Sequence, residues 1–265
     1  MKSIYNNYNF QSNHCEEGKL ITSNIDGLLH SSKLISSPKD LFFHAETAWG
    51  YNYPLVESNL DINFAWRDWS SFCKKNNIIA ELVKLPPFIN FDKKFLSIFE
   101  EVHLVSKTCS LELKDESFLK EFNKKTRYII RKSQDKFLYK KAEYSDLSSI
   151  KDLYYKSMIN LNAKKRFFLN IKTFEYLIKN QNCKIYLAYS DKTLISFVCF
   201  LFDENISHYH LSASNKLGRD LNANYFLLYK AIEESYEKGI KLIHYGGGLT
   251  NDENDNLFRF KLKFS

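Results

Sequence analysis

The fold of this chain is decided by the stretch Tyr245-Gly246-Gly247-Gly248 and by Phe258-Arg259-Phe260-Lys261, which follows it after the acidic loop Asp252-Glu253-Asn254-Asp255. Glycines allow another molecule to approach the backbone closely. A lysine held beside them offers a fixed positive charge. We therefore expect the C-terminal segment to fold back, so that Lys261 lies beside the glycine stretch at the tip of a mixed sheet.

The residues before this stretch predict a meander of three antiparallel strands. The runs Cys183–Tyr189, Thr193–Phe202 and Ile206–Ala213 are rich in β-branched and aromatic residues. They are separated by Ser190-Asp191-Lys192 and Asp203-Glu204-Asn205, and short polar segments of this kind suit tight turns.

A helix and a further strand follow the meander. Ala223–Lys238 carries an apolar stripe at helical spacing. Asn222 or Asn224 can cap its start, and Gly239 can end it in the left-handed conformation. Ile240–Tyr245 has the composition of a buried strand.

The segment upstream of the meander is also regular. We expect strands at Cys109–Leu113 and Phe137–Ala142, and helices at Glu116–Gln134, Asp146–Met158 and Ile171–Lys179, because their apolar residues recur at the matching periods.

Residues 1–105 are less regular. A short helix is compatible with the apolar spacing between Asn59 and Lys75, which is set by Leu60, Phe64, Trp66, Trp69 and Phe72. The apolar stretch Ile78–Leu85 ends at Pro86-Pro87, because proline cannot donate to a strand ladder. We therefore predict two domains, residues 1–105 and 106–265, in an α+β fold whose central sheet is mixed, mostly antiparallel and flanked by helices.

Composition indicates a globular protein. The 265 residues are 44% hydrophobic and 26% charged, which is ordinary. The formal net charge of +7 would attract an anionic partner such as CoA, a nucleotide sugar, tRNA or lipid phosphate. The five cysteines are scattered, which argues against a disulfide framework or a zinc site and fits a reducing cytosol. Met1–Phe10 lacks a signal-peptide core and no apolar run approaches ~18 residues, so we expect a cytoplasmic protein without a transmembrane segment.

The order of these elements, with the helix and strand after the meander, resembles the GNAT acyltransferase domain. The stretch from Tyr245 to Lys261 is similar to the closing motif of the Fem-type (FemABX-like) branch of that superfamily. This branch includes enzymes that build peptidoglycan cross-bridges from aminoacyl-tRNA and acetyltransferase-like proteins of polysaccharide loci. Asn123–Ser133 resembles the basic helix that opens the family's second domain, and Thr47–Pro54 resembles its N-terminal aromatic-glycine loop.

The resemblance implies two GNAT-like lobes, the first of them degenerate, with donor and acceptor meeting between them. Related chains continue beyond the Phe-Lys pair with a final strand, whereas this sequence stops at Ser265, so we expect either a trimmed version of the family fold or a sheet edge that is closed in another way. In the family this lysine is assigned to transition-state charge, which makes Lys261 the first catalytic candidate and Phe260 a wall of the site. The alternative is an edge strand in which the aromatic residues of 258–264 alternate with solvated cations.

The remaining candidates concern the two substrates. The loop Lys216–Asn222 stands where GNAT enzymes hold pyrophosphate on the amides of a helix start. The alternative for this loop is an ordinary capped turn. The alternative for Gly246, Gly247 and Gly248 is a surface loop without a binding role. The candidate donor-binding residues are Gly218, Arg219, Asn222, Gly246, Gly247 and Gly248. The candidate acceptor-binding residues are Trp49, Tyr51 and Arg127. The alternative for Trp49 and Tyr51 is that they belong to an aromatic core, and the alternative for Arg127 is that it lies on the solvated face of a basic helix.

A general base could come from the histidines of the sheet. His208 and His210 are two apart on one predicted strand and His244 lies on a neighbouring one. Imidazole titrates near pH ~6.5 and can accept an amine proton. We take His210 as the candidate base, although strand histidines are commonly hydrogen-bonded core residues. Two histidines without a carboxylate at ligand spacing do not predict a metal site.

We therefore expect an N-acyltransferase that moves an acyl or aminoacyl group to an amine of a cell-envelope precursor, small or lipid-linked. The cosubstrate would be acetyl-CoA or aminoacyl-tRNA, with no bound cofactor. The alternatives are an acetyl-CoA-dependent sugar N-acetyltransferase of a polysaccharide pathway and a catalytically inactive GNAT-like scaffold. A nucleic-acid-binding protein is a further alternative, but no DNA- or RNA-recognition motif supports it.

Overall fold

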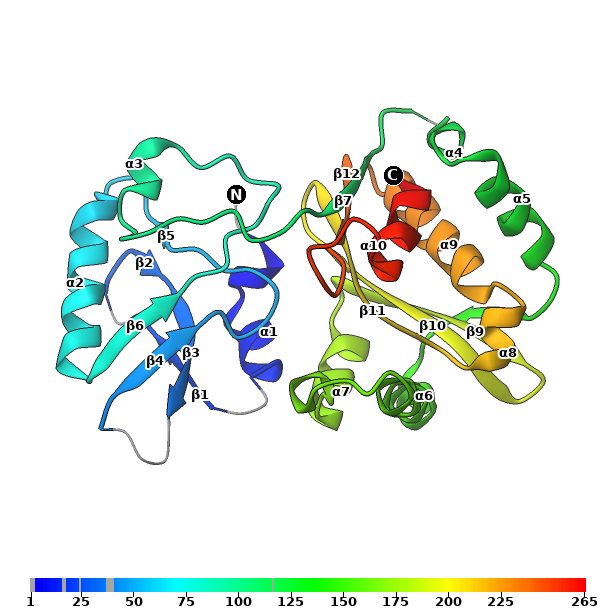
Figure 1. Cartoon of the computed structure of the whole chain (residues 1–265), viewed down its shortest axis with the longest axis horizontal. Coiled ribbons are helices and arrows are strands. Elements are labelled where there is room, and N and C mark those ends of the chain that lie inside the picture. Colours follow the sequence, from blue (N-terminus) through cyan, green and yellow to red (C-terminus); the bar gives the residue numbers. More distant parts are fainter. Residues whose placement is uncertain (1–2, 16–17, 24, 37–40, 116) are drawn as a thin grey trace. The chain divides into compact units, whose positions relative to one another are not determined.

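The computed structural model describes residues 3–15, 18–23, 25–36, 41–115 and 117–265. They form two compact units, Met1–Leu104 and Val105–Ser265, which are described separately (Figure 1). Met1 and Lys2 of the N-terminal segment, and Glu116 at the start of a predicted helix, lie outside the described residues.

The first unit is built on a four-stranded sheet in the order β1-β3-β4-β6. Its strands are β1 (Lys19–Thr22), β3 (Ser31–Ser36), β4 (Phe43–Glu46) and β6 (Ile78–Leu82). The pair β4–β6 is parallel, and the other two pairs are antiparallel. A second small sheet pairs β2 (Leu28–Leu29) with β5 (Leu55–Val56). The helices of this unit are η1 (Ile4–Asn6), α1 (Tyr8–Asn13), α2 (Ile62–Lys75) and α3 (Lys93–Leu96).

Helix α2 forms where the apolar spacing predicts it. Asp61 caps its start by accepting from Asn63 N. The buried side chains include Ala65, Trp69 and Cys73, each four residues after the last, so they share one face. Phe64, one of the residues whose spacing predicts the helix, is 53% exposed.

The second unit contains a six-stranded sheet in the order β7-β12-β11-β10-β9-β8. Its strands are β7 (Cys109–Glu112), β8 (Leu138–Lys141), β9 (Cys183–Ser190), β10 (Thr193–Phe202), β11 (Ile206–Ser214) and β12 (Leu242–Gly246). The predicted meander is confirmed as the antiparallel strands β9, β10 and β11. The single parallel pair among the described strands of this sheet is β11–β12.

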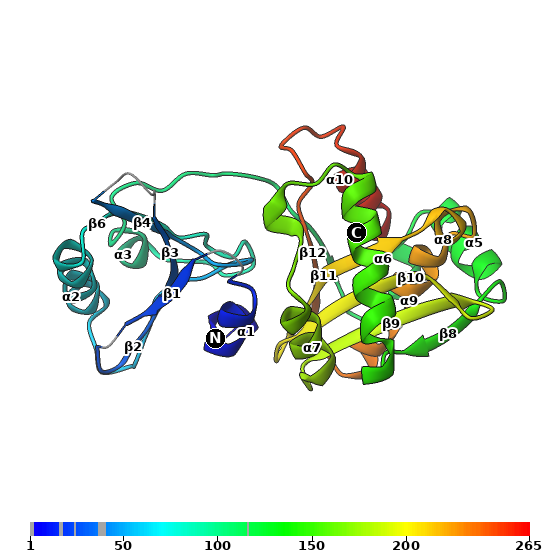
Figure 2. The same cartoon turned by 90° about the horizontal axis from the view of Figure 1, so that it is seen from below.

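Helices cover both faces of this sheet. In Figure 1, α5 and α9 lie above it and α6 and α7 below it, and Figure 2 shows α6 crossing the face opposite α9. The central strand β10 is buried from Leu194 to Phe202, as expected for a strand packed on both sides. The helices are α4 (Phe118–Glu121), α5 (Lys124–Ser133), η2 (Tyr144–Asp146), α6 (Leu147–Asn160), η3 (Lys165–Phe167), α7 (Ile171–Lys179), α8 (Lys216–Asp220), α9 (Ala223–Glu237), α10 (Asn256–Lys261) and η4 (Leu262–Phe264).

Three local expectations need correction. The helix predicted from Glu116 to Gln134 is divided into α4 and α5, because Asn123 caps a new helix by accepting from Thr126 N. Neither expected asparagine caps α9, since Asn222 occupies the cap position with φ +57° and no side-chain cap bond, and Asn224 binds serine hydroxyls instead. Residues 256–264 are helical, so the alternating edge strand is wrong. No described helix is long and apolar enough to cross a membrane.

Candidate active site

The parallel strands β11 and β12 pair over a short distance and then separate. Their register runs from Ile206 opposite Leu242 to His208 opposite His244, and β11 continues without β12 to Ser214. The two histidines at the last pair are buried, with Nδ1 atoms 3.4 Å apart. His208 Nε2 also lies 3.1 Å from Asp203 Oδ2. These two histidines therefore belong to the hydrogen-bonded core at the closed end of the split.

The glycine stretch begins where β12 ends. Close packing around it leaves no room for side chains at Gly247 and Gly248. Gly246 adopts a φ of +75°, which favours glycine. A Cβ on Gly247 would lie 2.9 Å from the Lys107 carbonyl oxygen. A Cβ on Gly248 would lie 2.6 Å from Asp255 Oδ1. A side chain on Gly247 would push the loop away from Lys107, and one on Gly248 would push it away from Asp255 at the start of the segment that carries Lys261.

Asp255 fastens the glycine loop to the start of α10. Its Oδ1 accepts from Phe258 N at 2.9 Å and so caps the helix. Its Oδ2 accepts from the backbone N–H groups of Leu249 at 3.1 Å and Thr250 at 3.2 Å. These bonds hold the pKa of Asp255 below its usual value. Asp255 was not among the predicted site residues, although its spacing to Phe258 is that of a helix N-cap.

Lys261 lies at the end of α10 with its ammonium turned into the protein. The residue is 8% exposed, and Nζ donates to the Gly247 carbonyl oxygen at 2.6 Å. The same nitrogen is 5.7 Å from the centroid of the Tyr209 ring and 3.4 Å from the place where a Cβ on Gly246 would stand. The structure therefore brings together Lys261, Gly246 and Gly247, three of the predicted site residues.

Burial shifts the pKa values of the titratable groups around Lys261. Desolvation lowers the pKa of Lys261 to about 8, while nearby Cys109 and Asp255 oppose the shift. Burial also raises the pKa of the Cys109 thiol. Tyr209 is a neighbour that the sequence did not single out, and burial raises its pKa to about 12, so its phenol stays neutral. A lysine ammonium has three N–H donors. Among the described residues Nζ has the single hydrogen bond to Gly247, which leaves two donors for a substrate oxygen.

Phe260 and His210 occupy different surroundings. The Phe260 ring packs edge-on against Tyr225 at 5.3 Å and Phe264 at 5.6 Å, so it is part of an aromatic cluster beside the lysine segment. His210 falls at a register shift of β11, between the pairs Phe200–Tyr209 and Cys199–Leu211. Regular alternation with His208 does not continue through this bulge. A role for either residue in the reaction stays a prediction.

The predicted donor loop folds as a short helix. Gly218 is buried in α8, and a Cβ there would lie 2.2 Å from the Ile195 carbonyl oxygen, so packing alone explains this glycine. Its N–H binds Asn215 Oδ1 at 2.8 Å, and Arg219 Nη1 donates to the Ser214 carbonyl oxygen at 2.7 Å. Asn222 leads into α9 without capping it. Donor binding at this loop stays a prediction.

The predicted acceptor residues lie on other elements. Trp49 and Tyr51 flank Gly50 in the first unit, where a Cβ on Gly50 would strike the Tyr5 ring. Burial raises the pKa of Tyr51 to about 12. Arg127 is exposed on α5 and donates to the Lys120 carbonyl oxygen at 3.0 Å. Within the described ranges, no three His, Cys, Asp or Glu side chains gather as a metal site would require.

Comparisons with known proteins agree with this architecture. Residues 172–261 match the model of an acetyltransferase (GNAT) domain. The crystal structure of FemX is similar with a TM-score of 0.68 and 12% identity, over 96% of this chain and 87% of that one. The C-terminal domain of a putative lysylphosphatidylglycerol synthetase from Agrobacterium fabrum has a TM-score of 0.64 and 12% identity, over 96% of this chain and 83% of that one. L-PGS from Bacillus licheniformis has a TM-score of 0.62 and 11% identity, over 94% of this chain and 79% of that one. A search of curated protein sequences finds no match.

Proposed function

The chain has the Fem-type fold of the GNAT acyltransferases and carries an acetyltransferase (GNAT) domain, and on that premise we propose that it transfers an acyl or aminoacyl group to an amine of a cell-envelope precursor. The observation that carries the proposal is the buried ammonium of Lys261 on the Gly247 carbonyl, beside the split between β11 and β12. A charge in such a place serves a reaction whose transition state carries negative charge on oxygen.

In the proposed reaction the acceptor amine attacks the activated carbonyl carbon directly. The new C–N bond forms a tetrahedral intermediate, and its oxyanion takes the two remaining donors of Lys261. The proton of the attacking amine passes to a base, for which His210 is our candidate. The C–S bond of a thioester, or the C–O bond of an aminoacyl ester, then breaks and releases the carrier. A well-placed donor of this kind is worth roughly 3 kcal/mol.

The donor is proposed to be acetyl-CoA or aminoacyl-tRNA. The match to an acetyltransferase domain favours acetyl-CoA, and with it the alternative of an amino sugar acceptor. The Asn222 side chain does not cap α9, although Tyr225 N donates to the Asn222 carbonyl oxygen, and the positive end of this 15-residue helix favours an anionic group. We keep Gly218, Arg219 and Asn222 as donor-binding proposals on this ground. Both donors are intracellular, so we also propose that the protein acts in the cytoplasm.

The acceptor is proposed to be a peptidoglycan peptide or an amino sugar, soluble or linked to lipid. The likeness to FemX and to a putative lysylphosphatidylglycerol synthetase supports an acceptor of the envelope, because lysylphosphatidylglycerol is an aminoacylated phospholipid. Trp49, Tyr51 and Arg127 remain our candidates for holding it. Aromatic rings and a guanidinium suit a ligand that combines sugar or peptide with phosphate.

Mass spectrometry would test the reaction. Purified protein is incubated with acetyl-CoA or with charged tRNA, each beside an amino sugar and a peptidoglycan precursor. With one of the two donors we expect a product heavier by the acyl group, and with Lys261→Met we expect this product to form about 10²- to 10³-fold more slowly. The matched control is Lys263→Met, which removes a cation two residues away that binds the Tyr225 hydroxyl. Equal turnover by both variants would contradict the role of Lys261, and no product with either donor would contradict the reaction.

A further inference from the structure

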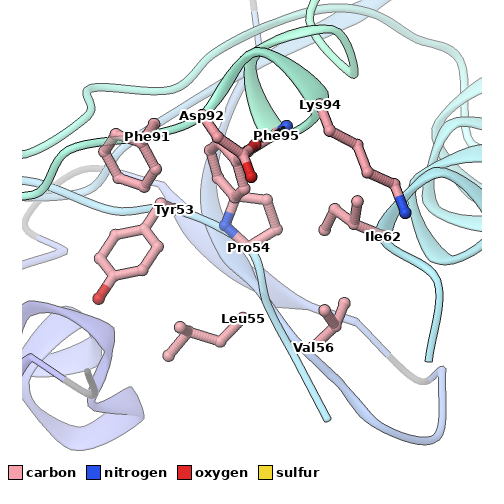
Figure 3. Close-up of a pocket in the computed structure, with 9 residues that line it drawn as sticks. All are labelled: Tyr53, Pro54, Leu55, Val56, Ile62, Phe91, Asp92, Lys94 and Phe95. Carbon is pink, nitrogen blue, oxygen red and sulfur yellow. Dashed lines mark hydrogen bonds between the residues drawn. The ribbon is translucent and has the colours of Figure 1, made fainter. Parts of the chain in front are cut away.

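The first unit contains a cavity of about 300 Å³ that the acyl-transfer proposal does not use. It is lined by Tyr53, Pro54, Leu55, Val56, Ile62, Phe91, Asp92, Lys94 and Phe95 (Figure 3). These residues come from β5 and the two residues before it, from the start of α2, and from α3 and the two residues before it. All of them belong to one compact unit, so this unit alone supplies the wall of the cavity.

The wall is mainly aromatic and aliphatic. Phe91 and Phe95 stack with their ring centroids 4.5 Å apart, and Tyr53 meets Phe91 edge-on at 5.3 Å. Rings that support one another in this way hold their positions when a ligand binds. A cavity of roughly this size, apolar with a few polar groups, is the usual form of a small-molecule site.

Two charged residues line the cavity, and they differ in how they are paired. The Lys94 ammonium donates to Asp61 Oδ2 at 2.8 Å, so its charge is already matched. Figure 3 shows this ammonium on the Ile62 side of the cavity. Asp92 uses Oδ1 to accept from Phe95 N at 2.7 Å, which caps α3. Its Oδ2 has no hydrogen bond to the described residues, so one carboxylate oxygen is available to a ligand.

Like the Asp92 carboxylate, the aromatic rings favour a positively charged ligand. The face of an aromatic ring carries negative potential and attracts organic cations. An anionic ligand would meet the Asp92 carboxylate and these ring faces, while the Lys94 ammonium is already held by Asp61. A cation with a hydrocarbon body would match both the wall and the open oxygen.

From this geometry we propose that the cavity of the first unit binds a small organic ammonium ion, with an aryl or branched alkyl group against the Phe91–Phe95 wall and its nitrogen beside Asp92. The binding needs no chemistry at Lys261, so it goes beyond the proposed transferase activity and can be tested apart from it.

The test compares three ligands that share a phenylethyl group: phenethylamine, 2-phenylethanol and 3-phenylpropionate. Isothermal titration calorimetry on the full chain at pH 7 measures their affinities. We expect saturable binding of the amine, weaker binding of the alcohol by about fivefold, as for one partly exposed ion pair, and weakest binding of the propionate. Equal affinities for the amine and the propionate, or no saturable binding of any of the three, would overturn the proposal.

Two variants locate the site. Asp92→Asn keeps a good N-cap on α3 but removes the charge, so the amine should bind only as well as the alcohol while the melting temperature stays within a few degrees. Val56→Phe fills part of the cavity and should weaken all three ligands by at least tenfold. An unchanged preference for the amine in Asp92→Asn would overturn the role of Asp92. Unchanged binding in a folded Val56→Phe protein would show that the ligands bind elsewhere.

Discussion

The Nζ atom of Lys261 donates to the carbonyl oxygen of Gly247 at 2.6 Å, which joins the last turn of α10 to the loop that follows β12. This one bond fixes the direction of a buried ammonium. Because the acceptor is a neutral carbonyl, the positive charge is oriented without being neutralised, and it remains able to stabilise a developing anion.

The first prediction concerns the loss of that charge. Lys261→Met keeps an apolar stem of similar length and removes the ammonium. If Lys261 stabilises the oxyanion, the rate of acyl transfer should fall by about 10²- to 10³-fold, with a small change in the KM for the donor. Initial rates at saturating acceptor measure this. A variant with full activity would remove Lys261 from the chemistry.

The second prediction concerns the pH dependence of activity. Burial lowers the pKa of Lys261 to about 8, so the ammonium is lost as the pH rises through that value. The rate should therefore fall on the alkaline side with a midpoint near pH 8. Lys261→Arg, whose guanidinium stays charged, should have a lower rate without that decline. A wild-type rate that is constant up to pH 9.5 would show that the charge of Lys261 is not required.

The same shift predicts how stability changes with pH. In the unfolded chain Lys261 keeps its proton up to its ordinary pKa of 10.5, whereas the folded protein releases it near 8. Between these values the unfolded state binds more protons, so stability rises with pH, by up to about 3 kcal/mol for this group. Urea unfolding at pH 7.5 and pH 9.5 should show part of this rise in the wild type. Lys261→Met should lack that part, and an identical pH response in both proteins would contradict the shift.

The fourth prediction concerns Asp255 as a positioning residue. Asp255→Ala removes the cap of α10 and the acceptor for Leu249 N and Thr250 N, so it should cost roughly 1–2 kcal/mol of stability. The loop that carries Gly247 should also lose its fixed place, which lowers the rate and moves the alkaline midpoint away from pH 8. Asp255→Asn can still cap the helix and should lose less stability. A changed melting temperature with an unchanged pH profile would reduce Asp255 to a structural role.

The site shows which features the sequence could predict. The proximity of Lys261 and the glycines was expected from the glycine stretch and the lysine that follows it, and the structure places Lys261 Nζ on the Gly247 carbonyl oxygen. The local structure of that segment was harder to predict, because Phe258, Phe260, Leu262 and Phe264 alternate with a period of two. The segment is helical because Asp255 caps it by accepting from Phe258 N. Hydrophobic periodicity carries no information about this single hydrogen bond.

Helix α2 shows a second limit of the same kind. The apolar spacing that predicts this helix includes Phe64, but spacing alone does not say which of the apolar residues face the sheet. The structure buries Ala65 instead, completely, because the small residue lets the helix approach its sheet, while Phe64 is 53% exposed. Which face packs inward depends on the partner surface, and that surface is made by strands distant in the sequence.

The last prediction separates packing from donor binding at Gly218. A methyl group there would lie 2.2 Å from the Ile195 carbonyl oxygen, a backbone atom that cannot move without shifting β10. Gly218→Ala should therefore destabilise the protein by roughly 1–3 kcal/mol or more, whether or not a donor is present. Gly239→Ala is the control, because Gly239 has φ +74° with nothing within 4 Å of the added carbon, and only backbone strain of about 1 kcal/mol is expected. Urea unfolding without ligand measures both costs. If Gly218→Ala is as stable as the wild type but binds CoA more weakly, the glycine serves the donor, and the packing explanation fails.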